Sequence, residues 1–351
     1  MKAARFHGPG DIRVEEVPEP EVRPGTVKVR VEWCGICGTD LHEYLEGPIL
    51  IPAPGSPHPL TGEEPPVIMG HEFAGVVAEV GPGVTGLAEG DRVAVEPYHT
   101  CGKCPACLAG RYNVCRSLGF VGLAGGGGGF AEYCVVDATR AHPLGGIPTD
   151  LGALVEPLAV GYHAVRLSGV RPGQTAVVFG SGPIGLVTTA CLRAAGAGRV
   201  IVVEPAAARK AKAPGAGADV VLDPAETDVP AAVADLTGGA GADVAFECAG
   251  LDAVLAQAIS SVRAGGTVVN VAIWGHPATL QMNDLVMKEV SVLGTLAYCD
   301  DHPDTIRLLA DGKVDAGRFI TARVPLDDIV DGGFRELIGN KDEHVKILIR
   351  P

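Results

Sequence analysis

The sequence predicts an α/β protein that combines a β-rich domain with a doubly wound parallel sheet. Two patterns along the chain predict this fold. Over about the first 150 residues, short alternating segments are separated by glycine and proline, which is typical of β-rich structure. From about residue 156, continuous apolar runs alternate with helical segments, as in a parallel sheet covered by helices. The length of 351 residues is enough for two domains of ordinary size.

The individual elements follow from the same patterns. In the β-rich part, alternation of apolar and polar residues predicts strands over residues 27–32, 91–95 and 130–136. In the second part, apolar runs predict buried parallel strands over residues 176–179, 200–203, 219–222, 243–246 and 266–271. A mixed pattern returns near residue 298 and ends in an apolar run over residues 344–349. We therefore expect one domain from residues 1–155 and 296–351, and a second from residues 156–295.

Composition excludes several classes of function. The formal charge is −14, with 42 acidic and 28 basic residues, and no basic patch is visible, so a nucleic-acid partner is not expected. No apolar run approaches the ~18–20 residues that span a bilayer, so no membrane partner is expected. The N-terminal residues lack the apolar stretch of a signal peptide, and a cytoplasmic location is expected.

Four of the ten cysteines form a compact cluster. They lie within fifteen residues, at positions Cys101, Cys104, Cys107 and Cys115. Disulfides are the alternative for a cysteine-rich chain, but they are typical of short secreted proteins. This spacing instead predicts one tetrahedral zinc ion bound by four thiolates.

A glycine-rich turn follows the first buried strand of the second domain. It contains Gly180, Gly182, Pro183, Ile184 and Gly185, and a helix is expected over residues 184–195. Glu204 lies 19 residues after Gly185, at the end of the next strand. This context predicts a dinucleotide site, although an ordinary strand-to-helix turn is the alternative. The negative charge of Glu204 favours NAD over NADP, while the nearby Arg209 weakens that preference.

A second metal site is predicted from residues that are distant in the sequence. Thiolate from Cys37 and imidazole from His71 suit zinc, and a carboxylate from Glu72 or Glu156 would complete three ligands. Taken singly, each of these residues also fits a structural role. Cys37 fits a buried core thiol, His71 a turn histidine, and Glu156 a helix cap or a surface carboxylate.

Several motifs together resemble zinc-dependent medium-chain alcohol dehydrogenases. They are Gly35–Asp40, Gly70–Glu72, the four-cysteine cluster, Val155–Pro157 and Gly180–Gly185, in that order. Within that superfamily the chain is most similar to the 2,3-butanediol and polyol (sorbitol-type) dehydrogenase branch, through residues 31–44, the insert at residues 47–66 and the tail at residues 333–346. The resemblance implies a GroES-like catalytic domain and a Rossmann cofactor domain.

The resemblance also implies roles for individual residues. Cys37, His71 and Glu156 match the ligands of the catalytic zinc, with Glu72 as an adjacent or alternating ligand. Asp40 matches the carboxylate that orients His71. Thr39 and His42 match a proton relay that leads towards solvent. The four clustered cysteines match a structural zinc site, so two zinc ions per chain, NAD and a homo-oligomer (dimer or tetramer) are expected.

The expected activity is that of an NAD-linked enzyme that interconverts a small vicinal diol and its hydroxyketone, with 2,3-butanediol and acetoin as the favoured pair. One alternative is a polyol or L-threonine dehydrogenase of the same family. Another is a non-catalytic protein that binds zinc and a dinucleotide, which the joint presence of Cys37, Thr39, His42, His71 and Glu156 disfavours.

Three further expectations concern less distinctive segments. The insert at residues 47–66 is too long for an ordinary connection, which favours a lid. Pro214 is expected to end the helix that follows Glu204 near Ala213. Six histidines are expected in loops or at the surface, namely His58, His99, His142, His276, His302 and His344.

Overall fold

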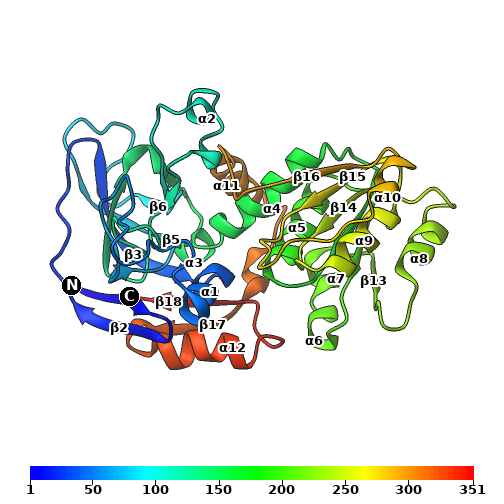
Figure 1. Cartoon of the computed structure of the whole chain (residues 1–351). Coiled ribbons are helices and arrows are strands. Elements are labelled where there is room, and N and C mark those ends of the chain that lie inside the picture. Colours follow the sequence, from blue (N-terminus) through cyan, green and yellow to red (C-terminus); the bar gives the residue numbers. More distant parts are fainter. The chain divides into compact units, whose positions relative to one another are not determined.

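The computed structural model describes residues 1–351 and divides into two compact units. The first unit contains residues 1–156, 302–310 and 316–351, and the second contains residues 157–301 and 311–315. Figure 1 shows a β-rich first unit and a second unit in which helices flank one sheet. The domain limits expected from the sequence remain a prediction.

The strands of the first unit pair antiparallel, except for the parallel pair of β17 and β18. Its main sheet has seven strands, with β10, β6, β5, β3, β18 and β17 in order and β9 paired with β3; two smaller sheets are β2-β1-β4 and β7-β8. The strands are β1 (Lys2–Gly8), β2 (Asp11–Glu16), β3 (Thr26–Gly35), β4 (Val67–Ile68), β5 (Glu72–Val80), β6 (Arg92–Val95), β7 (Tyr98–His99), β8 (Gly119–Phe120), β9 (Tyr133–Asp137), β10 (Ala141–Pro143), β17 (Ile320–Pro325) and β18 (Lys346–Arg350).

Short helices connect these strands. The α-helices of this unit are α1 (Gly38–Glu46), α2 (Pro105–Leu108), α3 (Thr149–Gly152), α11 (His302–Ala310) and α12 (Glu336–Gly339), and a π-helical turn covers Ile329–Arg335. Short 3-10 turns cover Tyr112–Val114, Ala138–Arg140, Ala316–Phe319 and Leu326–Asp328. The apolar faces of β1, β3, β5 and β18 meet in one core that includes Phe6, Val29, Phe73 and Ile347.

The C-terminal strand completes the main sheet of the first unit. β18 runs antiparallel to β3, with Leu348 opposite Gly35 and Ile349 opposite Cys34, and parallel to β17. Lys346 is 3 % exposed and the three residues that follow it are fully buried. This pairing places the start of β18 beside the end of β3, where α1 begins.

The second unit is a parallel six-stranded sheet in the order β13-β12-β11-β14-β15-β16. Its strands are β11 (Thr175–Phe179), β12 (Arg199–Val203), β13 (Val220–Leu222), β14 (Ala242–Glu247), β15 (Val262–Asn270) and β16 (Ser291–Gly294). Its helices are α5 (Pro183–Ala194), α6 (Ala207–Lys210), α7 (Ala213–Ala216), α8 (Val229–Leu236), α9 (Asp252–Ser261) and α10 (Met282–Val286), and α4 (Val155–Ser168) leads into it. The strand order reverses beside β11, which is where such sheets bind ligands.

Two expectations from the sequence are corrected. Pro214 does not end a longer helix, because α6 already stops at Lys210 and Pro214 lies in the first turn of α7. A proline is tolerated there, since first-turn N–H groups have no partner within the helix. His302 is not a surface residue, because its side chain is fully buried at the start of α11.

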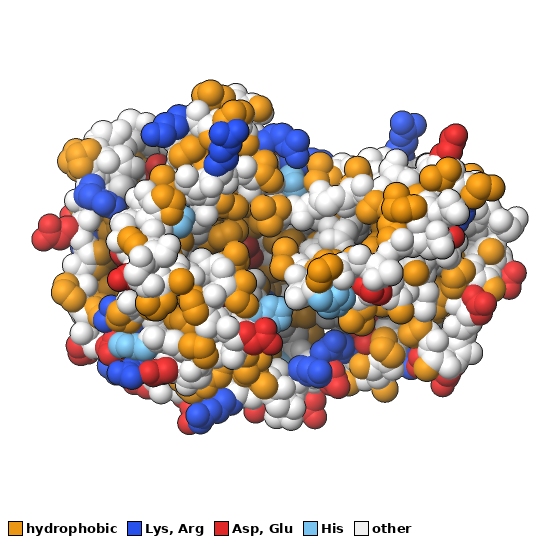
Figure 2. Space-filling model, in the orientation of Figure 1, with side chains coloured by type: hydrophobic (Ala, Val, Ile, Leu, Met, Phe, Trp, Pro, Cys, Tyr) orange, Lys and Arg blue, Asp and Glu red, His pale blue; other side chains and the backbone are white.

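Figure 2 shows how charged and hydrophobic side chains are distributed on one face of the molecule. On the face seen in Figure 2, basic side chains are scattered among acidic and hydrophobic ones. None of the helices is both long and apolar enough to cross a membrane.

Candidate active site

The start of α1 fixes two of the predicted site residues. The backbone N–H of Cys37 donates to Oδ2 of Asp40 at 2.9 Å, which closes the first turn of the helix. Asp40 is fully buried, and Cys37 is partly exposed. The Sγ atom of Cys37 lies 3.7 Å from the Thr39 hydroxyl oxygen. The sequence therefore folds locally into a turn that presents a thiol and a hydroxyl together.

His71 meets this turn from the start of β5. Its Nδ1 atom lies 3.3 Å from Oδ1 of Asp40, and the ring is 4 % exposed. Burial lowers the pKa of His71, but the charges of Asp40 and Cys37 raise it more, so the net pKa is well above its ordinary value. When the ring is neutral, as a metal ligand must be, a proton on Nδ1 that faces Asp40 leaves the Nε2 lone pair available to a metal.

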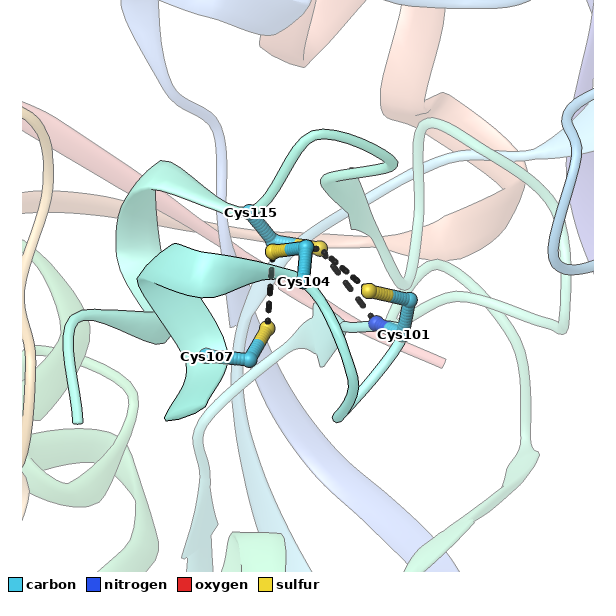
Figure 3. Close-up of side chains that lie close together, drawn as sticks. All are labelled: Cys101, Cys104, Cys107 and Cys115. Carbon is cyan, nitrogen blue, oxygen red and sulfur yellow. Dashed lines mark hydrogen bonds between the residues drawn. The ribbon is translucent and has the colours of Figure 1, made fainter. Parts of the chain in front are cut away.

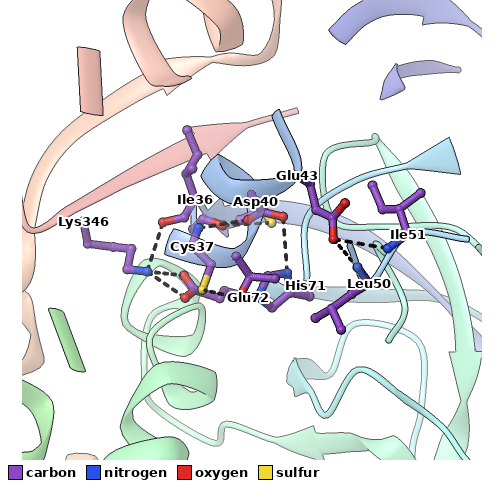
Figure 4. A network of polar contacts seen from close by, with 12 residues as sticks. Ile36, Cys37, Asp40, Glu43, Leu50, Ile51, His71, Glu72 and Lys346 are labelled. Carbon is purple, nitrogen blue, oxygen red and sulfur yellow. Dashed lines mark hydrogen bonds and ion pairs between the residues drawn. The ribbon is translucent and has the colours of Figure 1, made fainter. Parts of the chain in front are cut away.

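Cys37, His71 and Glu72 converge in space, as Figure 4 shows. One potential ligand atom from each lies within 4.8 Å of the others. Sulfur, imidazole nitrogen and carboxylate oxygen are the donors that zinc accepts, so this donor set fits a zinc ion. The structure thus brings together residues that are 34 and 35 positions apart in the sequence.

Glu72 has a partner that the sequence analysis missed. Lys346 on β18 donates to both carboxylate oxygens of Glu72, at 2.6 and 2.5 Å, and to the carbonyl oxygen of Ile36 at 3.0 Å. Both side chains are buried. One signal was available, because Lys346 interrupts an otherwise apolar run from Val345 to Ile349. A lysine in such a run is expected to have a buried acidic partner.

The remaining predicted residues of this site occupy different positions. Glu156 lies in the first turn of α4 and is 6 % exposed. Burial lowers the pKa of Lys346, and the charges of Glu72 and Cys37 raise it. The charge of Glu156 makes a smaller contribution to this rise. His42 is exposed on α1, three residues after Thr39, so the two side chains share one face of the helix.

The four clustered cysteines form a second site, shown in Figure 3. Their Sγ atoms are 3.6 Å apart for Cys104–Cys107, 4.0 Å for Cys104–Cys115 and 3.5 Å for Cys101–Cys115. Tetrahedral zinc with Zn–S bonds of about 2.3 Å requires sulfur separations of about 3.8 Å. All four cysteines are free thiols, and backbone N–H groups of Cys107 and Arg116 lower the pKa of Cys104 to about 6. The cluster therefore has the dimensions of a zinc–thiolate site.

The glycine turn of the second unit links β11 to α5. Gly180 has a φ of +101°, and a Cβ atom on Gly185 would overlap the Gly180 carbonyl, so both positions require glycine. Gly182 caps α5, and Pro183 and Ile184 follow in its first turn. A Cβ on Gly182 would meet nothing within 4 Å, which leaves open space at the N-terminus of the helix.

Glu204 stands beside this turn at the end of β12. Its carboxylate accepts backbone N–H groups from Ser181 at 2.8 Å and Ala206 at 2.9 Å, and it is 4 % exposed. Arg209 lies in α6, and its carbonyl accepts the Ser181 hydroxyl at 3.2 Å. The structure thus brings the predicted cofactor-binding residues to one edge of the sheet.

A third group of titratable residues was not predicted. Glu96, His142 and His302 offer ligand atoms within 4.8 Å of one another. The two imidazole rings are stacked, with centroids 5.2 Å apart and planes at 28°. Ring lone pairs lie in the ring planes, and two nearly parallel planes do not direct them at one ion. The Glu96 carboxylate contacts Arg140 at 2.9 Å, the Tyr112 hydroxyl at 2.7 Å and Nε2 of His142 at 3.2 Å.

Comparison with known proteins agrees with this geometry. Residues 23–146 match the alcohol dehydrogenase GroES-like domain, and residues 183–311 match the zinc-binding dehydrogenase domain. The chain is 49% identical over 353 residues to (R,R)-butanediol dehydrogenase of Neisseria gonorrhoeae, covering 100% of this chain and 99% of that protein. It is 36% identical over 362 residues to sorbitol dehydrogenase of Bacillus subtilis, covering 100% and 97%. The crystal structure of 2R,3R-butanediol dehydrogenase from Bacillus subtilis superimposes with a TM-score of 0.94 at 48% identity, covering 100% and 99%.

The predicted fold, a GroES-like β-rich domain with a Rossmann sheet, is confirmed by these matches. The resemblance drawn from the sequence motifs is confirmed as well, since the matched relatives cover the whole chain. The chain belongs to the zinc-dependent medium-chain alcohol dehydrogenases and is an oxidoreductase of that family.

Proposed function

We propose that this enzyme interconverts a small vicinal diol and its hydroxyketone, with 2,3-butanediol and acetoin as the physiological pair and NAD as the hydride carrier. The observation that carries the proposal is the Cys37–His71–Glu72 cluster in a chain that is 49% identical to a butanediol dehydrogenase over its full length. The lower identity of 36% to a sorbitol dehydrogenase favours a diol over a polyol substrate.

We assign Cys37, His71 and Glu156 as the ligands of the catalytic zinc. Glu156 is buried close enough to this cluster for its charge to raise the pKa of Lys346, and Lys346 binds both carboxylate oxygens of Glu72. Glu72 would reach the metal only after releasing Lys346, which fits an alternating role. Asp40 holds His71 in the tautomer that leaves Nε2 available for the zinc.

The residues around this cluster account for the movement of the proton. When bound, zinc would supply Lewis-acid polarisation of the substrate oxygen and NAD would supply the hydride acceptor. Thr39 stands beside Cys37 and accepts the proton of the substrate hydroxyl. His42, exposed on the same face of α1, passes that proton to solvent. In the reductive direction the same two residues return a proton to the carbonyl oxygen.

We infer that the glycine turn binds the pyrophosphate of NAD. The N-terminus of α5 and the open space beside Gly182 suit an anionic group. Glu204 is fixed by two backbone N–H groups and keeps further acceptor capacity for the ribose hydroxyls. Its negative charge disfavours the 2′-phosphate of NADP, while Arg209 in the neighbouring helix limits the extent of that discrimination.

We also propose a second, structural zinc ion at Cys101, Cys104, Cys107 and Cys115, which gives two zinc ions per chain. The sulfur separations support this assignment, because they match a tetrahedral site with no room for another ligand. A closed site of this kind stabilises its loop and leaves the chemistry to the open site.

We propose a homodimer formed through the edge of the parallel sheet. β16 is the terminal strand of that sheet, and all four of its residues are exposed. Val292, Leu293, Val286 and Met287 present large apolar side chains beside this edge. Unprotected apolar edges are avoided in monomers, so a second copy is the fitting occupant. Light scattering of the wild type and of Val292→Lys measures their molar masses. The variant is expected to have a lower molar mass than the wild-type dimer, and equal masses would contradict an interface at this edge.

The substrate proposal is tested by initial rates with purified protein. The panel holds the stereoisomers of 2,3-butanediol together with sorbitol, L-threonine and ethanol, each with NAD and with NADP. A clear preference for butanediol with NAD is expected. Higher rates on sorbitol or threonine would retain the family and replace the substrate. No turnover in protein that contains zinc would favour a non-catalytic zinc and dinucleotide-binding role.

A further inference from the structure

The insert at residues 47–66 is attached to α1 through one buried carboxylate. Glu43, in the last part of α1, is fully buried, and its side chain accepts three consecutive backbone N–H groups. Oε2 accepts the N–H of Ile49 at 2.8 Å, and Oε1 accepts those of Leu50 at 2.5 Å and Ile51 at 3.2 Å. Figure 4 shows the bonds to Leu50 and Ile51, with Asp40 and His71 nearby.

This arrangement is specific to the carboxylate. A buried anion is costly unless hydrogen bonds replace the water it loses, and successive N–H groups form such a concave anion site. The chain therefore bends around Glu43 directly after the helix ends. Gly47 makes the bend possible, because a Cβ atom there would lie 2.5 Å from both the carbonyl oxygen and Oε2 of Glu43.

The far end of the insert is bonded to residues on either side of β8. The Thr61 hydroxyl donates to the carbonyl of Ala124 at 2.6 Å, and Glu63 accepts the N–H of Gly126 at 3.1 Å. His58 contacts the carbonyl of Leu118 at 3.3 Å. The insert is thus fastened at both ends.

Both attachment points lie close along the chain to residues that contact the Cys37–His71–Glu72 cluster. α1 begins directly after Cys37 and carries Thr39 and Asp40. β8, which starts one residue after Leu118, carries Phe120, whose ring centroid is 6.3 Å from that of His71. The insert is therefore bonded to two chain segments that lead directly to residues in contact with the cluster. At its root, Ile49 and Leu50 are 56 % and 51 % exposed, next to the buried Ile51.

We propose that Glu43 is a positioning residue for substrate recognition. By capturing the N–H groups of Ile49, Leu50 and Ile51, it holds the root of the insert rigid beside the catalytic cluster, with two apolar side chains facing outward. A fixed apolar wall at this place recognises the alkyl part of a small alcohol and contributes to binding without entering the chemical step. The inference rests on the proposed function for the identity of the substrate, but not for the attachment itself.

The test compares Glu43→Gln and Gly47→Ala with wild type and with Glu46→Gln. Glutamine has nearly the same shape but only one acceptor oxygen, and the Gly47 variant disturbs the carboxylate from the opposite side. Glu46 is exposed on the same helix and provides the matched control. For both test variants we expect the KM of the diol to rise about tenfold, as for the loss of a charged hydrogen bond. Little change is expected in kcat, in the KM of NAD or in zinc content.

Hydrogen exchange supplies a readout that does not depend on activity. The amides of residues 49–51 should exchange faster in both test variants and remain protected in the Glu46 control. Faster exchange with an unchanged substrate KM would overturn the recognition role. A parallel fall in kcat, zinc content and melting temperature would make Glu43 a general structural residue and would equally overturn it.

The design separates this inference from the substrate assignment. If the wild type oxidises another alcohol of the panel better than butanediol, the KM comparison is made with that alcohol. A rise in KM there would uphold the role of Glu43 while the butanediol assignment failed. An unchanged KM would reject the role whichever alcohol is the substrate.

Discussion

Lys346 and Glu72 form a buried ion pair beside the catalytic cluster, with Nζ 2.6 and 2.5 Å from the two carboxylate oxygens. Burial lowers the pKa of Lys346, but Glu72 and Cys37 raise it more, so the lysine is held in its charged form. Lys346 thus places a positive charge beside the cluster that balances the charge of Glu72, and the motifs of the predicted ligands do not reveal it.

Replacing Lys346 should destabilise the protein strongly. Lys346→Met leaves the Glu72 carboxylate buried without a partner, and we expect a loss of about 3–5 kcal/mol in the free energy of unfolding. Urea denaturation at pH 7 measures this loss. Lys28 is the matched control, because it pairs with half-exposed carboxylates of Glu19 and Glu79, and Lys28→Met should cost less than about 1 kcal/mol. Equal losses in the two variants would contradict a special role for the buried pair.

Asp40 should control metal affinity through His71. Asp40→Asn keeps an acceptor for the Cys37 N–H but removes the charge that faces Nδ1 of His71. We expect the affinity for the catalytic zinc to fall by about 10–100-fold. Competition with a chelator, followed by metal analysis, measures the change. Asp331→Asn, which disturbs an exposed pair with Arg335, should leave the affinity unaltered. Full zinc retention in Asp40→Asn would refute the prediction.

The four-cysteine cluster should account for one of two zinc ions. Cys107→Ser removes one ligand, and we expect the zinc content to fall from about two to about one per chain, with a lower melting temperature. Cys248→Ala changes a cysteine of the other unit that stands apart from this cluster and should retain both ions. Metal analysis after dialysis distinguishes the two variants. A content that stays at two in Cys107→Ser would exclude this cluster as a zinc site.

Glu96 should make stability depend on acid pH. Burial raises its pKa, but His142, His302, Arg140 and Tyr112 lower it more, to about 2 from an ordinary value of 4.5. A depressed carboxyl pKa stabilises the fold above the unfolded value, and that stabilisation disappears as pH falls from 4.5 towards 2. The shift corresponds to about 3 kcal/mol at neutral pH.

Comparison of the wild type with Glu96→Gln isolates this contribution. The wild type should be the more stable protein at pH 6, and the difference in unfolding free energy should shrink steadily between pH 5 and pH 3. Acid-induced loss of zinc affects both proteins, so it largely cancels in the difference. A gap that stays constant over this range would show that Glu96 titrates normally.

The sequence predicted the parts of the molecule that depend on local pattern. The parallel strands followed from apolar runs, because a strand buried on both faces needs apolar side chains throughout, as in β11. The four-cysteine cluster and the glycine turn followed from spacing, since their geometry is set within one short loop. Cys37 and His71 were matched by motif, and the structure shows what joins them, namely the carboxylate of Asp40.

The features that were missed depend on distant pairing. His302 appeared to be a loop residue because nothing near it in the sequence reveals that its ring stacks on His142. Pro214 was assigned to the end of a helix because proline disfavours a helix interior. Proline also favours the first turn of a new helix, and the local sequence did not distinguish an ending helix from a beginning one. The role of the insert as a lid stays a prediction, and its length did not reveal that Glu43 holds it at three consecutive amides.

The pairing of β18 with β3 has a consequence for the order of events during synthesis. Glu72 leaves the ribosome 274 residues before Lys346 does. At typical translation speeds of about 5–20 residues per second, that interval lasts on the order of half a minute. During this interval the nascent first unit contains Glu72 but lacks strand β18 and Lys346, the cation that pairs with Glu72. The catalytic cluster therefore matures only after translation has passed through the entire Rossmann domain.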